Sequence, residues 1–84
     1  MITKEKLEIF KLYNGDIDAF GHGKMRHRKV MTDGEFYLIA KLLQDVCLIK
    51  KNLVSIEYEA GLNKRLRDNC ENEDTIEEIK LLSA

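Results

Sequence analysis

The feature that most constrains the fold is the segment from Thr32 to Ile49, which opens with a helix-capping signature and continues as a long apolar pattern. Thr32 and Glu35 have the spacing of a capping box, in which each side chain accepts a hydrogen bond from a free backbone N–H group at a helix start. At about 100° per residue, the apolar residues that follow cover more than half of the helix circumference. They are Phe36, Leu38, Ile39, Ala40, Leu42, Leu43, Val46, Cys47 and Ile49. Such a helix needs contacts on several sides. We therefore predict a long central helix that ends near residues 50–52 and leaves Lys41, Gln44 and Asp45 for solvent.

The sequence before this segment predicts one helix and one isolated helical turn. Thr3 is a suitable N-cap for a helix over residues 4–13, which the Asn14-Gly15 pair would end. Asp16 can cap the single turn that follows, and we expect Ile17 and Phe20 to hold this turn against the core.

The sequence after the central segment predicts two more helices. Ser55 begins a helix that extends to about Asn69, and a short helix follows from Thr75 to about Leu82. We expect Asp74 to cap the short helix, with Ile76, Ile79 and Leu82 facing inward. The complete prediction is an all-α fold: a small bundle of about four helices with a long central second helix, in one domain over residues 1–84.

Composition excludes several classes of function. The chain is 44% hydrophobic and 35% charged, which is typical of a folded domain, and 14 basic against 15 acidic residues give a net charge of −1, unlike a strongly basic nucleic-acid binder. No segment approaches the roughly 18 apolar residues of a membrane span, so we expect no membrane partner. The charged start of the chain does not resemble a secretion signal, and Cys47 and Cys70 form no disulfide pattern. We expect a cytoplasmic protein with reduced thiols.

Two motifs suggest metal binding, and each departs from the pattern that a metal needs. Asp16, Asp18 and Gly21 match three positions of a calcium-binding loop, but Phe20 stands where that loop has an oxygen ligand. His22 and His27 are five residues apart, which is not a recognised zinc spacing. We expect helix capping at Asp16, and no metal or other cofactor.

The most unusual stretch is residues 22–29, where basic side chains and histidines are concentrated. Its candidate partner-binding residues are Lys24, Arg26, His27, Arg28 and Lys29. Such a cluster can contact an acidic protein, bind phosphates of a nucleic acid, or be a solvated loop with no dedicated role. The stretch has no aromatic side chain on which bases would stack, so nucleic acid is the less favoured partner.

The residues offer little for catalysis, and we expect no enzyme, because no nucleophile, base and orienting group can be recognised together. Two further candidates for partner contact, Tyr37 and Leu48, fall on the polar side of the central helix. The pattern leaves open whether another helix covers them.

We therefore expect a non-catalytic protein-binding module, such as a neutraliser of a partner protein (immunity- or antitoxin-like) or an adaptor. Two alternatives stay open: a nucleic-acid-binding regulator that uses residues 24–29, and a homo-oligomeric structural protein, with a homodimer as the simplest form. The sequence also leaves open whether the basic segment or the acidic residues around 71–78 form the contact surface.

Overall fold

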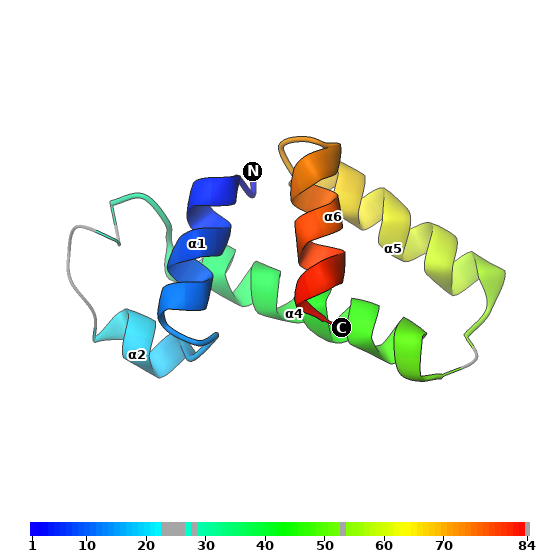
Figure 1. Ribbon diagram of the computed structural model, residues 1–84, viewed down its shortest axis with the longest axis horizontal. Helices are drawn as coiled ribbons and strands as arrows, with labels where there is room; N and C mark the ends of the chain where they lie inside the picture. Colours follow the sequence, from blue (N-terminus) through cyan, green and yellow to red (C-terminus); the bar gives the residue numbers. More distant parts are fainter. Residues whose placement is uncertain (23–26, 28, 53, 84) are drawn as a thin grey trace.

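The central helix α4, which spans Asp33–Lys51, organises the computed structural model of the chain. The structure describes residues 1–22, 27, 29–52 and 54–83. Over these residues the other helices are α1 (Lys4–Leu12), α2 (Ile17–Gly21), α5 (Ile56–Asn69) and α6 (Glu73–Leu82). The predicted all-α fold with a long central helix is confirmed (Figure 1).

The start of α4 has the capping box that its sequence predicts. The Thr32 hydroxyl accepts a hydrogen bond from the Glu35 backbone N–H (3.2 Å), and a Glu35 carboxylate oxygen accepts one from the Thr32 backbone N–H (3.0 Å). The helix ends at Lys51, and the Asn52 N–H reaches the Leu48 carbonyl. Its fully inward residues, Phe36, Ile39, Leu42 and Val46, all belong to the apolar arc identified in the sequence.

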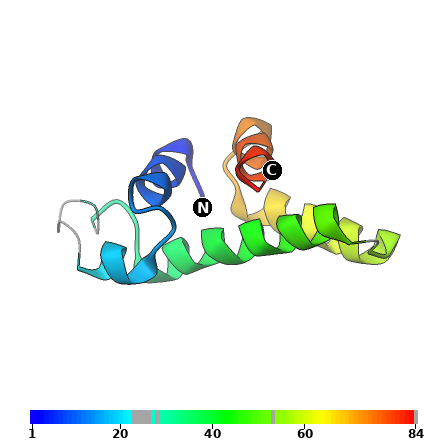
Figure 2. The same cartoon turned by 60° about the horizontal axis from the view of Figure 1, so that its bottom comes forward.

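The other helices are distributed unevenly around α4. Figure 1 shows α1 and α6 crossing it steeply, and Figure 2 shows both of them on the same side of it. After the turn that follows α4, α5 runs back beside its C-terminal half, and α2 lies at its N-terminal end (Figure 1). The molecule is therefore elongated along α4, with principal extents of 41 × 22 × 18 Å.

Three phenylalanines from three helices fill the core at the N-terminal end of α4. The ring centroid of Phe36 lies 4.7 Å from that of Phe10 on α1 and 4.7 Å from that of Phe20 on α2. Tyr13 meets the edge of Phe20 at 5.6 Å. These contacts fix the single turn α2 to the central helix.

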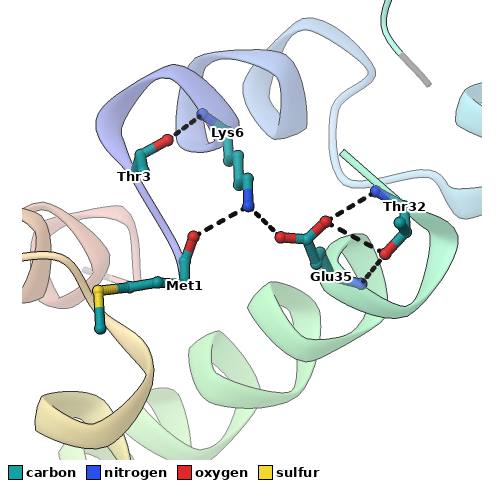
Figure 3. Close-up of polar contacts among 5 residues, drawn as sticks. All are labelled: Met1, Thr3, Lys6, Thr32 and Glu35. Carbon is teal, nitrogen blue, oxygen red and sulfur yellow. Dashed lines mark hydrogen bonds and ion pairs between the residues drawn. The ribbon is translucent and has the colours of Figure 1, made fainter. Parts of the chain in front are cut away.

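The N-terminal residues are fixed at two places. The Ile2 N–H donates to the Asn69 carbonyl (2.7 Å), the Glu71 N–H donates to the Ile2 carbonyl (2.9 Å), and the Ile2 side chain is 1% exposed. At the second place, the Lys6 ammonium bridges the Met1 carbonyl and the Glu35 carboxylate (Figure 3). Ile2 thus ties the first residues to the α5–α6 connection, and Lys6 ties α1 to the capping box of α4.

The prediction for the start of α6 was wrong. The N-cap is Asn72, whose side chain accepts a hydrogen bond from the Thr75 backbone N–H (3.0 Å), and the helix begins at Glu73 rather than at Thr75. Thr75 is completely buried, and its hydroxyl also donates to Asn72 (3.2 Å). Because α6 begins at Glu73, Asp74 and Thr75 both lie in its first turn. The side chain of Thr75 packs into the core.

Three side chains lie in surroundings that the sequence did not predict. Ile17, the first residue of α2, is 40% exposed, because only Phe20 of that short helix reaches the core. Leu82, in the last turn of α6, is 38% exposed, unlike Ile76 and Ile79. Asp45 of α4 was expected in solvent, but its side chain is only 17% exposed because Arg65 of α5 forms an ion pair with it.

Candidate protein-contact surface

Tyr37, Lys41, Gln44 and Leu48 form a line along α4, here called the α4 stripe. Their spacing of four, three and four residues places them on one narrow face of a helix. All four are exposed, Tyr37 at 57% and Leu48 at 44%. The question that the sequence left open is settled: both apolar members of the stripe face solvent, with two polar residues between them.

The α4 stripe is held rigidly, since the other sides of the same helix pack into the core. Phe36 and Ile39 are fully buried, and α1 and α6 cover the same side of α4 in Figure 2. Within the stripe, the Lys41 ammonium donates to the Gln44 side-chain carbonyl at 3.4 Å. A partner would therefore meet preformed helix geometry rather than a loop that must first become ordered.

The predicted basic cluster is described only in part. Lys24, Arg26 and Arg28 lie outside the described residues. Lys29 is exposed, whereas His27 is half-buried, and its Nδ1 lies 2.7 Å from the Tyr13 hydroxyl. The two rings also meet edge to face at 5.6 Å. His27 is thus engaged by an internal contact with the end of α1.

The motif that resembled a calcium loop serves as a helix cap. One Asp16 carboxylate oxygen accepts from the backbone N–H groups of Asp18 (2.9 Å) and Ala19 (3.3 Å) at the start of α2. The His22 ring nitrogen Nδ1 is 2.8 Å from the Asp18 carbonyl oxygen, which accepts a hydrogen bond from it. In the described part of the chain, no three metal-binding side chains gather into a site.

The surroundings of Cys70 do not activate its thiol. Cys47 and Cys70 are both free thiols, Cys47 half-buried and Cys70 buried. Burial raises the pKa of the Cys70 thiol to about 11, so it stays protonated at neutral pH. Cys70 instead packs in the core beside the Ile2 pairing.

The structure also contains a groove that the sequence did not predict. It lies between α1 and α6, encloses about 270 Å³, and is lined by Phe10, Lys11, Asn14, Gly15, Leu43 and Leu82. Lys11 and Glu78 form an ion pair (2.5 Å) between the two helices. Hydrogen bonding between them raises the pKa of Lys11 and lowers the pKa of Glu78. The sequence analysis did not predict this groove because it placed Leu82 in the core, whereas Leu82 lines the groove.

Over the residues that the structure describes, none of the helices combines the length and the apolar character that crossing a bilayer requires. No protein-family model, no characterised protein and no solved structure matches this chain.

Proposed function

We propose that this chain is a non-catalytic, cytoplasmic protein-binding module whose contact surface is the α4 stripe. The observation that carries the proposal is the joint exposure of Tyr37 and Leu48 on one face of a helix whose other faces form the core.

The chemistry of the α4 stripe is suited to a protein partner. Tyrosine combines a large apolar ring with a hydroxyl group and is enriched at the energetic centres of interfaces. Leu48 offers a second apolar contact on the same line, and Lys41 and Gln44 supply polar groups between them. Because α4 is already ordered, binding costs little backbone entropy.

Binding is favoured over catalysis by how the reactive groups are used. The Cys70 thiol is buried with a raised pKa, the Asp16 carboxylate caps α2, and the His27 ring contacts Tyr13. Each of these groups would be a candidate in a catalytic mechanism, and each has a structural role instead. The free thiols of Cys47 and Cys70 also suit a reducing compartment.

Photo-crosslinking from the α4 stripe tests the proposal. A photoreactive phenylalanine derivative replaces Lys41, at the middle of the stripe, and in a control chain it replaces Leu81, which is 71% exposed on α6. Irradiation in the native cell lysate should give a discrete protein adduct from position 41 and none from position 81.

A matched pair of double variants locates the surface independently. Tyr37→Ala/Leu48→Ala should lose the partner in a pull-down, and Leu12→Ala/Leu81→Ala, which removes two exposed leucines elsewhere, should retain it. Retention by both variants would move the contact to another surface. Recovery of nucleic acid alone would favour a regulator instead of a protein-binding module.

A further inference from the structure

We infer that the α4 stripe is the interface between two copies of this chain, packed antiparallel about a two-fold axis that passes between Lys41 and Gln44. The inference rests on the proposed function, because it takes the α4 stripe as the contact surface. It adds the identity of the partner, which is a second copy of this chain.

The order of residues in the stripe is symmetric in chemical character about its midpoint. Tyr37 lies four residues before Lys41, and Leu48 lies four residues after Gln44. In a two-fold interface, residue i of one copy meets residue j of the other while j meets i. An antiparallel pair therefore places each Tyr37 opposite the Leu48 of the other copy, so that apolar residues face each other twice.

The two central positions match in the same arrangement. Lys41 of one copy lies opposite Gln44 of the other, and the Lys41 ammonium can donate to that amide as it donates to Gln44 of its own chain at 3.4 Å. A parallel pair would instead place Lys41 opposite Lys41, with two like charges facing each other. The polar centre thus favours the antiparallel direction and fixes the register, as a buried polar residue does in a coiled coil.

Helix geometry and charge at the helix ends agree with this arrangement. The four-three-four spacing is that of the contact positions of helices that pack at about 20°. Antiparallel packing also brings the partial positive charge at the start of each α4 beside the partial negative charge at the end of the other copy's α4.

The length of α4 limits the area that the dimer can bury. Its 19 residues span about 28 Å at a rise of about 1.5 Å per residue, and a stable interface buries about 800 Å² on each partner. A single helix face of that length reaches only the lower end of the range. We therefore expect a reversible dimer with a Kd on the order of micromolar.

Two charge variants that differ at one position test both the dimer and its direction. In Tyr37→Lys/Leu48→Glu, antiparallel packing places each lysine opposite a glutamate. In Tyr37→Lys/Leu48→Lys, both of these pairings place lysine opposite lysine. Both changed residues are exposed, so both variants should fold, which circular dichroism confirms before the comparison. Sedimentation equilibrium over a concentration series then gives each Kd.

The wild type should dimerise, the Lys/Glu variant should keep its Kd within about tenfold, and the Lys/Lys variant should weaken it by about 100-fold or more. Added salt should weaken the Lys/Glu dimer more than the wild-type dimer, because its contacts are ionic. Dissociation of both variants would overturn the antiparallel register. If both variants dimerised with the wild-type Kd, the α4 stripe would not be the dimer interface.

A wild type that stays monomeric at about 1 mM would overturn the inference, since the expected Kd is on the order of micromolar. The crosslink from position 41 separates that failure from failure of the proposed function. A monomeric chain that crosslinks there to a different protein overturns only the choice of a second copy. A monomeric chain without any adduct overturns both.

Discussion

Lys6 of α1 forms an ion pair with Glu35 in the first turn of α4, 29 residues further along the chain. The same carboxylate accepts hydrogen bonds from the backbone N–H and the hydroxyl of Thr32 (Figure 3). Glu35 therefore has a local role, as part of the capping box, and a tertiary role, as the contact between two helices.

Two substitutions separate these roles. Glu35→Gln keeps an oxygen that can accept from Thr32 but loses the charge that faces Lys6. Glu35→Ala loses both interactions. We expect Glu35→Ala to lower the free energy of unfolding by about 1–2 kcal/mol and Glu35→Gln by about 0.5 kcal/mol. Urea denaturation at neutral pH measures both, and equal effects would show that only one of the two roles contributes.

The ion pair also predicts a pH dependence. Hydrogen bonding to Lys6 first, and to Thr32 second, holds the pKa of Glu35 below its ordinary value of 4.5. A carboxyl group with a lowered pKa in the folded state stabilises the protein above its unfolded-state pKa, and this stabilisation is lost as the pH falls through the folded-state pKa. The difference in unfolding free energy between wild type and Glu35→Gln should therefore shrink steadily once the pH falls below about 4.5. A constant difference down to acid unfolding would contradict it.

Ile2 should be among the most sensitive positions in the chain although it lies next to the N-terminus. Its side chain is 1% exposed, so Ile2→Ala should cost about 2–4 kcal/mol of unfolding free energy. Ile56 is the matched control, because the same residue type is 85% exposed there and Ile56→Ala should change stability by less than about 0.5 kcal/mol. Thermal or urea unfolding of the two variants side by side provides the comparison.

The cap of α6 can be tested by two neighbouring substitutions. Asn72→Ala removes the side-chain oxygen that accepts from Thr75 and should cost about 1 kcal/mol. Asp74→Ala removes only a first-turn charge and should cost less, with an effect that salt reduces. If Asp74→Ala were the more damaging change in urea titrations at two salt concentrations, the helix would begin later than the structure places it.

The two thiols should differ in reactivity. Because burial raises the pKa of Cys70 to about 11, the native thiol should react with a thiol-specific disulfide reagent at pH 8 far more slowly than the thiol in the unfolded chain. A Cys47→Ser variant isolates the signal of Cys70, and a Cys70→Ser variant isolates that of Cys47. Rapid labelling of Cys70 in the folded protein would mean that the α5–α6 connection opens readily.

The sequence predicted those parts of the fold that are determined within a few residues. Thr32 and Glu35 interact over three positions, and Asp16 caps the turn that directly follows it, so both could be recognised from spacing. The start of α6 was predicted incorrectly because Asn72 and Asp74 are both good caps. The choice between them depends on the packing of Thr75, which no local rule contains.

The contact surface was predicted less completely, for a related reason. The helical pattern placed Tyr37 and Leu48 on one face, but exposure depends on where the other helices lie. The structure places α1 and α6 on the same side of α4, which leaves these residues uncovered. The pairing of Ile2 with Asn69 and Glu71 had no sequence signal at all, since it joins residues that are 67 and 69 positions apart in the sequence.

That pairing bears on the order in which contacts can form. Ile2 and Asn69 are 67 residues apart in the sequence, whereas Thr32 and Glu35 of the capping box are three residues apart. Closing a longer loop costs more chain entropy, so the capping box should form before the pairing of Ile2. The segment that carries Ile2 is therefore expected to dock late in folding.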